Sequence, residues 1–292
     1  MNFVSHRRLL EDVRGWANQL PEDLVAVAGV PRSGLLPATL LALHRNLHLV
    51  SLDELIRGEQ PWQMPLRRGV PARQTGRVLV VDDTVNTGGT IGQVRREIGE
   101  RDDVLFGAVY FAERVPEVVD AAFRSVPQAR CFEWNVFHSD YMRVSCLDMD
   151  GVICEDWTDF ETDDEAGRQR YRHHLQQACP RHVPTYPVMA IVTSRLERYR
   201  TDTVNWLRNQ GVRFEELVMS PYCSARQRQE AGDHARRKAA CYAGLASARL
   251  FVESDANQAN QIASLSQRPV LCTDTMELAR GPISPTTQRL TS

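Results

Sequence analysis

Short apolar runs alternate along the chain with polar or glycine-bearing turns and with amphipathic segments. The chain opens on a helical pattern, LLEDVRGWANQL, and three apolar runs follow: LVAVAGVPRSG, RVLVVDDTVNTGGT and VLFGAVYFAE. Such runs are typical of buried parallel strands, and the helical patterns GLLPATLLALH and TIGQVRREIGE lie between them. This alternation predicts a doubly wound α/β sheet, in which ligands bind at the carboxyl ends of the strands.

The same alternation begins again after about residue 142, with the runs RVSCLDMDGVIC, PVMAIVTSR and ARLFVESD. We expect the aromatic segment RCFEWNVFHSDYM to finish the first sheet and to lead into the second. A chain of 292 residues is long enough for two domains. We therefore predict two doubly wound α/β domains, at residues 1–140 and 141–280, and a mobile polar tail at 281–292.

Composition excludes several classes of protein. Hydrophobic residues make up 42% of the chain and charged residues make up 25%. The formal net charge is -2, so the overall charge gives no reason to expect binding to nucleic acid or to an anionic membrane. The basic, polar start MNFVSHRRLLEDVR does not have the pattern of a signal peptide, and no run of 18 apolar residues occurs. The seven cysteines form no CxxC pair, which favours reduced thiols and a cytoplasmic protein.

The segment Val78–Thr90, VLVVDDTVNTGGT, carries the strongest chemical signal. Four apolar residues predict a buried strand, and Asp82 and Asp83 stand at its carboxyl end. The loop that follows is rich in Thr and Gly and leads into a helix, so backbone N–H groups and the helix N-terminus can converge on an anion. The loop therefore suits a phosphate monoester, and the acids suit either ribose hydroxyls or Mg²⁺ held through water.

This segment resembles the phosphoribosyl-diphosphate (PRPP) signature of the type I phosphoribosyltransferases, in which two acids and three further residues precede Thr-Gly-Gly-Thr. The resemblance implies that PRPP is bound by Asp82, Asp83, Thr87, Gly88, Gly89 and Thr90. Upstream, the turn PRSG follows an apolar run at the place of the family's pyrophosphate loop, which assigns Arg32, Ser33 and Gly34 to the pyrophosphate. The implied reaction is displacement at ribose C1 by a nitrogenous base or similar nucleophile.

Between these motifs lies the segment Arg57–Arg77, with three Pro, three Gly and several arginines. In the family a mobile loop at this place closes over the substrates and excludes water. Arg67, Arg68 and Arg73 are equal candidates for a charge role there. The absence of lysine from the first 237 residues argues against an orotate-type enzyme, which uses a loop lysine.

In the second half, the sequence SCLDMDGV places Asp148 and Asp150 after a short strand. One carboxylate can attack phosphorus and the other can protonate the leaving oxygen. The motif resembles motif one of the haloacid dehalogenase (HAD) superfamily, whose usual activity is phosphate-ester hydrolysis. The resemblance implies Thr193 as a hydroxyl donor, Lys238 as the motif-three lysine, and a Mg²⁺ site drawn from Asp148, Asp150, Glu253 and Asp255. Glu253 is the preferred motif-four ligand, although the family more often has Asp in this motif.

Lys238 is the single lysine among 35 basic residues, which indicates a site where a compact ammonium is required. Just after Thr193, the residue of the family's motif two, Arg195 is expected near the mouth of the site, either as helical surface charge or as a contact to a phosphate-bearing substrate. The acid-rich stretch EDWTDFETDDE is expected to form a solvated face. A zinc site in HHLQQACPRH is disfavoured by its irregular spacing.

Together these observations predict a bifunctional enzyme with Mg²⁺ as cofactor. The first domain would transfer ribose 5-phosphate from PRPP to an unidentified base, and the second would dephosphorylate the phosphorylated intermediate to a nucleoside-like product. Two alternatives remain: a regulatory module that senses PRPP or nucleotides, and a salvage transferase with a purely structural HAD domain. The predicted partners are small molecules, with no nucleic acid and no membrane. A homodimer is a further prediction.

Overall fold

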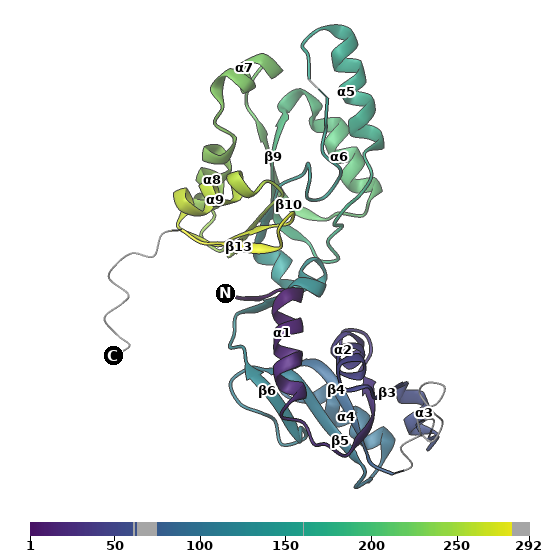
Figure 1. Cartoon of the computed structure of the whole chain (residues 1–292). Coiled ribbons are helices and arrows are strands. Elements are labelled where there is room, and N and C mark those ends of the chain that lie inside the picture. Colours follow the sequence, from purple (N-terminus) through teal and green to yellow (C-terminus); the bar gives the residue numbers. More distant parts are fainter. Residues whose placement is uncertain (61, 63–74, 160, 282–292) are drawn as a thin grey trace, which may run out of the picture. The chain divides into compact units, whose positions relative to one another are not determined.

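The computed structural model describes residues 1–60, 62, 75–159 and 161–281 (Figure 1). The chain divides into two compact units, Asn2–Trp134 and Asn135–Ser292, the second of which also includes Met1. Most of the predicted mobile loop Arg57–Arg77 and nearly all of the predicted tail at 281–292 lie outside the described residues.

The first unit is built on a five-stranded parallel sheet with the order β3-β2-β4-β5-β6. These strands are β2 (Leu24–Gly29), β3 (His48–Val50), β4 (Arg77–Val85), β5 (Val104–Phe111) and β6 (Ala121–Ser125). The helices described in this unit are α1 (His6–Ala17), α2 (Leu35–Arg45), α3 (Leu52–Ile56) and α4 (Gly89–Ile98). A separate two-stranded parallel sheet joins β1 (Asn2–Val4) to β7 (Arg130–Phe132).

Alternation along β4 explains how this sheet is covered on both faces. Leu79 and Val81 pack in a cluster with apolar residues of α1 and α2, which lie side by side in Figure 1. Val78 and Val80 point to the opposite face and pack with residues of α3 and α4. Successive side chains of a strand point to opposite faces, so a continuous apolar run is what a sheet with two covered faces requires.

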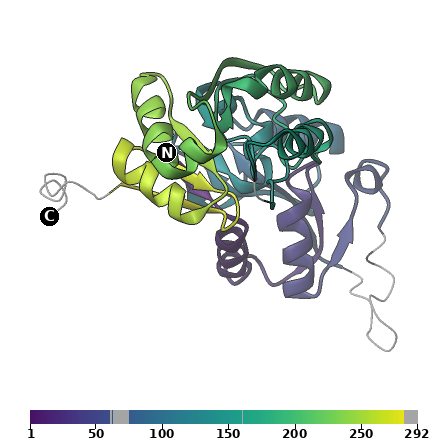
Figure 2. The same ribbon diagram turned by 90° about the horizontal axis from the view of Figure 1, so that it is seen from above.

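The second unit contains a six-stranded sheet with the order β10-β9-β8-β11-β12-β13. Its strands are β8 (Ser145–Leu147), β9 (Val188–Leu196), β10 (Phe214–Ser220), β11 (Leu250–Glu253), β12 (Val270–Cys272) and β13 (Glu277–Ala279), and only the β12–β13 pairing within this sheet is antiparallel. The helices described here are α5 (Glu165–Gln177), α6 (Arg200–Asn209), α7 (Ala225–Ala231), α8 (His234–Gly244) and α9 (Ala256–Ser266). Helices α8 and α9 pack side by side on one face of this sheet (Figure 2).

In both sheets, the order of the strands reverses at one point, and ligands bind beside such switch points in open α/β sheets. In the first unit the reversal lies between β2 and β4, whose carboxyl ends carry the PRSG turn and the Asp82-Asp83 pair. In the second it lies between β8 and β11, which are followed by Asp148 and end at Glu253, respectively. Both groups of predicted site residues therefore lie where topology favours a ligand.

Several predicted elements differ from the structure. Strand β4 continues through Asp82 and Asp83 to Val85, because the chain keeps pairing with β5 beyond the apolar run. The prediction that RCFEWNVFHSDYM finishes the first sheet is wrong: β7 pairs with β1 in a sheet of its own, and 3-10 turns follow. Among the described residues, no helix is both long enough and apolar enough to cross a bilayer.

Candidate functional site

The Thr-Gly-Gly-Thr loop passes directly from β4 into α4. Gly88 is the N-cap of that helix and has a left-handed backbone, with φ of 80°. A Cβ at Gly88 would lie 2.6 Å from the Val118 side chain, so both backbone conformation and space require glycine. Helix α4 therefore begins at this loop. The first N–H groups of a helix have no partner within it, and such helix N-termini bind phosphate.

Asp82 and Asp83 are both buried, at 8% and 2% exposure, and have different surroundings. The two oxygens of Asp83 accept hydrogen bonds from Ser33 Oγ at 2.8 Å and from Trp134 Nε1 at 2.6 Å. Asp82 accepts a hydrogen bond from the Asp83 backbone N–H at 2.9 Å. Burial and the neighbouring Asp83 raise the pKa of Asp82 to about 8. A ligand that brings a cation or hydroxyl donors would relieve this repulsion.

The PRSG turn lies tightly against β4. A Cβ on Gly34 would come within 2.6 Å of the carbonyl oxygens of Val30 and Val81, so only glycine fits between the turn and the sheet. This close approach allows Ser33 to reach Asp83, while Arg32 in the same turn is exposed. The structure thus brings Ser33 and Gly34 to the Asp82-Asp83 pair and leaves the Arg32 guanidinium at the surface.

A cavity of about 330 Å³ lies over the loop. Its lining includes the predicted residues Asp82, Thr87, Gly88, Gly89 and Thr90. Thr84 and Arg130 also line it, and the sequence analysis named neither. Thr84 follows from strand alternation, since it is two residues from Asp82 and on the same face. No local pattern indicates Arg130, which the β1–β7 pairing brings there from 40 residues downstream of the loop.

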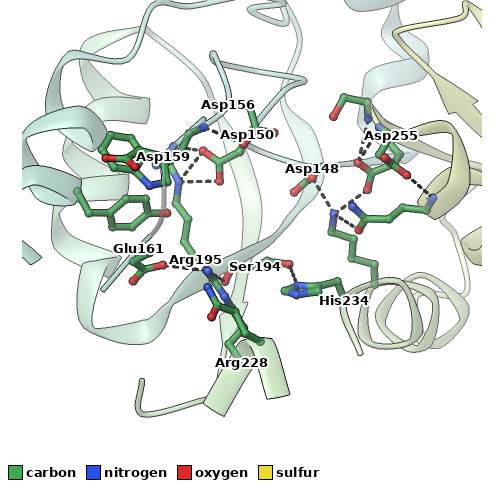
Figure 3. A pocket seen from close by; sticks show the side chains of 17 residues that line it. Asp148, Asp150, Asp156, Asp159, Glu161, Ser194, Arg195, Arg228, His234 and Asp255 are labelled. Carbon is green, nitrogen blue, oxygen red and sulfur yellow. Dashed lines mark hydrogen bonds and ion pairs between the residues drawn. The ribbon is translucent and has the colours of Figure 1, made fainter. Parts of the chain in front are cut away.

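A second cavity, of about 320 Å³, lies at the carboxyl ends of β8 and β11 (Figure 3). The residues predicted for this site that line it are Asp148, Asp150, Lys238, Glu253 and Asp255. Thr193 is buried near the end of β9, and its Oγ1 accepts a hydrogen bond from the Arg195 backbone N–H at 3.2 Å. Ser194, the next residue, lines the cavity and lies 2.8 Å from His234 Nδ1.

Lys238 joins the two carboxylates that end the central strands. Its Nζ lies 2.7 Å from Asp148 Oδ2 and 2.6 Å from Glu253 Oε2, and the lysine side chain is 4% exposed. Burial alone would lower the pKa of Lys238, but the two carboxylates raise it above its ordinary value. Burial also raises the pKa of Asp148, and Lys238 opposes that shift. Two carboxylates and one ammonium leave one formal negative charge in excess.

Asp150 faces the other side of the cavity and is held by Arg195 (Figure 3). Arg195 Nε donates to both oxygens of Asp150 at 3.0 Å, and Nη2 donates to Oδ1 at 2.5 Å. Burial would raise the pKa of Asp150, but the Arg195 charge holds it below its ordinary value. The expectation of helical surface charge is wrong for Arg195, since it lies in β9 and its side chain is fully buried against Asp150. Arg195 does line the cavity, and its contact to a phosphate-bearing substrate stays a prediction.

The acid-rich stretch after β8 is not simply a solvated face, because part of it lines the cavity. Asp156, Asp159 and Glu161 all contribute to the wall. Glu161 is 7% exposed and pairs with Arg228 of α7 at 3.0 Å. Asp163 accepts hydrogen bonds from the backbone N–H groups of Ala225 and Arg226 at the start of α7. These contacts fasten the stretch to α7.

The four carboxylates of the predicted metal set line one cavity, but they do not form a ready-made metal site. Asp150 is bound to Arg195, and Asp255 caps α9 by accepting from the Gln258 N–H at 2.7 Å. In the part of the chain that the structure describes, no three His, Cys, Asp or Glu side chains are close enough to hold a metal by themselves. Asp148 and Glu253 nevertheless fit Mg²⁺, since they are oxygen donors with an excess negative charge at a cavity wall.

Comparison with known proteins agrees with the geometry of the first site. Residues 2–144 match the family model of the phosphoribosyl transferase domain. The xanthine-guanine phosphoribosyltransferase of Chromohalobacter salexigens is 33% identical over 128 residues, which are 43% of this chain and 76% of that protein.

Two solved structures are also similar to this part of the chain. The first is a purine phosphoribosyltransferase from Pyrococcus horikoshii, with 21% identity, a TM-score of 0.33, and coverage of 46% of this chain and 92% of that chain. The second is the Helicobacter pylori xanthine-guanine-hypoxanthine phosphoribosyltransferase, with 20% identity, a TM-score of 0.32, and coverage of 46% of this chain and 93% of that chain. The family model and the 33% identical relative carry the assignment. Through its first 144 residues, the chain belongs to the phosphoribosyltransferase domain family.

Proposed function

We propose that this protein is a bifunctional enzyme. Its first unit transfers ribose 5-phosphate from PRPP to a nitrogenous base, and its second unit removes the 5-phosphate to release a nucleoside-like product. The family supports the transferase activity. The phosphatase activity is supported by one observation above all: the only lysine of the chain bridges the carboxylates that follow two adjacent central strands.

In the transferase reaction, the base attacks ribose C1 and the bond from C1 to the pyrophosphate oxygen breaks. The Thr87–Thr90 loop would hold the 5-phosphate, and Asp82 and Asp83 would face the ribose hydroxyls. The turn at Arg32–Gly34 would receive the leaving pyrophosphate. Bound Mg²⁺ would supply positive charge to the pyrophosphate. The protein's own contribution is to position the reactants and to stabilise the developing charge.

The acceptor is proposed to be a purine-type base, because the 33% identical relative is a xanthine-guanine phosphoribosyltransferase. The chain covers 76% of that relative. The assignment of a purine-type base therefore rests on that relative.

The second site resembles the HAD superfamily in the order and placement of its four motifs. Asp148 would attack phosphorus, the bond from phosphorus to the ester oxygen would break, and Asp150 would give that oxygen a proton. Water would then attack the aspartyl-phosphate, with Asp150 taking a proton back, and phosphate would leave. Lys238 would offset the repulsion between Asp148 and the incoming phosphate. Mg²⁺ held by Asp148 and Glu253 would supply further positive charge.

In the structure, Asp150 is paired with Arg195. Proton donation by Asp150 therefore requires that its hydrogen bonds to Arg195 break or that substrate binding moves the carboxyl group.

The two competing proposals are a PRPP-sensing module and a transferase with a structural second unit. The buried Lys238 bridge favours chemistry over the second of these, because a site used only for packing gains little from burying three charges.

The decisive experiment is a screen of candidate bases with PRPP and Mg²⁺, in which pyrophosphate and inorganic phosphate are measured in the same reaction. A bifunctional enzyme releases both, and the two amounts become equal as the intermediate is consumed. Pyrophosphate alone would leave a transferase with an inactive second unit. PRPP binding with neither product from any base would favour the sensing module.

A further inference from the structure

Arg130 brings a guanidinium to the cavity over the Thr87–Thr90 loop. It is the first residue of β7, where it pairs with Asn2 of β1. Its Nη2 donates to the Val85 carbonyl oxygen at 3.1 Å, and its guanidinium carbon lies 5.7 Å from the centre of the Phe132 ring. These contacts hold the side chain beside the loop, since Val85 lies two residues before Thr87.

Two polar atoms of residues that line this cavity are buried and have no hydrogen-bond partner among the described residues. They are Arg130 Nη1 and Thr84 Oγ1. Buried polar groups in native proteins are almost always paired, so two orphans at one cavity indicate a missing ligand. Arg130 Nη1 can only donate, and a hydroxyl can also donate, so the ligand must offer acceptor oxygens.

The positive charge of Arg130 is also incompletely neutralised by nearby carboxylates. The carboxylate whose charge acts on it is Asp83, and both oxygens of Asp83 already accept hydrogen bonds from Ser33 and Trp134. The loop Asn86–Thr90 contains no basic residue, so its own donors are uncharged N–H and O–H groups. A phosphate there would lie near two carboxylates, and a cation on the cavity wall would offset their repulsion.

We propose that Arg130, assisted by the Thr84 hydroxyl, binds the phosphomonoester of the sugar phosphate held in the Thr87–Thr90 loop. The inference rests on the proposed PRPP site. It adds a cationic contact from a different sheet to a loop that otherwise binds through neutral donors. A charged fork and a hydroxyl suit a phosphate dianion, which offers three oxygens.

The test measures binding to the full-length protein by calorimetry, with Mg²⁺ present and with ribose 5-phosphate, pyrophosphate and PRPP as separate ligands. For Arg130→Gln we expect affinity for ribose 5-phosphate and PRPP to fall by about 10- to 100-fold, which is the range for losing one charge-assisted hydrogen bond. Pyrophosphate affinity should stay at the wild-type value. Arg96→Gln is the matched control, because it removes an equal charge from an exposed position of α4.

Two further variants separate ligand contact from a structural role. Arg130→Lys keeps the charge but not the planar fork, and should recover most of the affinity for ribose 5-phosphate. Thr84→Val keeps the shape of the side chain and should lose about 3- to 10-fold for that ligand, as expected for one neutral hydrogen bond. The wild-type affinity should also depend more steeply on salt than that of Arg130→Gln.

Three results would overturn the inference. Equal loss of pyrophosphate and ribose 5-phosphate binding in Arg130→Gln would mean that Arg130 only supports Asp83 and the fold of the site. Unchanged ribose 5-phosphate binding in a folded Arg130→Gln protein would assign the guanidinium to another ligand, such as an anionic group of the base. Failure of the wild type to bind either sugar phosphate would defeat the proposed transferase site itself, and this inference with it.

Discussion

At the scale of single residues, buried charged side chains characterise both candidate sites. In the second cavity, one ammonium lies between two carboxylates, and a fully buried guanidinium holds a third. In the first cavity, Asp82 and Asp83 are adjacent and buried, and Asp83 is satisfied by neutral donors from Ser33 and Trp134. Burying charge is costly unless geometry repays it, so conservative substitutions at these positions are informative.

We predict that Lys238→Arg lowers phosphatase turnover by about 10²–10³-fold, the range for losing one donor to a transition state. The Nζ atom lies within 2.7 Å of both carboxylates in a side-chain site that is 4% exposed, and a planar fork cannot take the place of this point donor. Phosphate and pyrophosphate release from one preparation of the variant provide the measurement. Pyrophosphate release should be unchanged, and near-wild-type phosphate release would show that the lone lysine is an accident of composition.

Asp82 makes stability depend on pH. Its pKa is raised to about 8 in the folded protein, so between about pH 4, where the unfolded carboxyl ionises, and pH 8 the folded state binds the extra proton. The contribution of Asp82 to stability is therefore present at low pH and declines as pH rises across this window. We expect Asp82→Asn to remove that decline, so the melting temperature of the variant should gain on that of the wild type from pH 5 to pH 8.

The measurement is a series of melting curves without PRPP or Mg²⁺, following the transition that we expect PRPP to shift upward in the wild type. Asp102→Asn is the control, because it removes an exposed carboxylate from the same unit and should run parallel to the wild type. A constant difference between Asp82→Asn and the wild type at every pH would contradict a shifted Asp82.

At the scale of elements, the short helix α7 and the acid-rich stretch before α5 act as one wall of the second cavity. Asp163 accepts hydrogen bonds from two N–H groups at the start of α7, in addition to the Ser224 cap. Glu161 pairs with Arg228 near the middle of the helix. A helix of seven residues has little stability of its own, so these contacts are what place it beside the site.

We expect Glu161→Ala to destabilise the second unit by about 3 kcal/mol, at the low end of the cost of leaving a buried charge unpaired. The low end is chosen because Arg228 keeps its hydrogen bond to the Ser194 carbonyl oxygen. Chemical denaturation of the full chain provides the measurement. The control is Glu230→Ala on the same helix, whose partner Arg226 is 83% exposed and whose loss should cost no more than about 0.5 kcal/mol.

At the scale of the whole molecule, the described residues form two large sheets besides the small β1–β7 sheet, and each large sheet has its own switch point and its own cavity. The boundary between the two compact units lies between Trp134 and Asn135. The predicted domain boundary is near residue 140, and the match to the family model extends to residue 144. The rings of Phe137 and His182 are stacked with their centres 4.5 Å apart, and His138 Nδ1 lies 2.6 Å from Thr185 Oγ1. This connecting segment therefore packs with residues that follow it.

Cutting the chain near residue 140 is predicted to yield two soluble fragments, since each sheet has its own helical cover. The C-terminal fragment should keep hydrolysis of a generic phosphate ester, and the N-terminal fragment should keep PRPP binding. A second cut after Trp134 is the comparison, because it leaves the Phe137 and His138 contacts within one fragment. Insolubility of both fragments at both cut sites would mean that the two halves depend on each other to fold.

Much of the fold follows from local pattern. Apolar runs such as RVLVV favour strands in a sheet with two covered faces, and the helical patterns between them predict the crossovers. The acids at Asp82, Asp83 and Asp148 stand out because charge seldom follows an apolar strand without reason. The resemblance to the PRPP motif needs only contiguous residues, so sequence alone could assign the first candidate site to one loop.

Tertiary structure decided the partners of those residues. Arg130 reaches the Thr87–Thr90 loop only through the β1–β7 pairing, and Arg195 meets Asp150 from the end of a neighbouring strand. The wall formed by Glu161 and Arg228 joins segments 67 residues apart. Sequence patterns report which face of an element is buried, because burial repeats with the local period. They do not report which buried charges meet, because that depends on sheet order and register, which are set by packing across the whole unit.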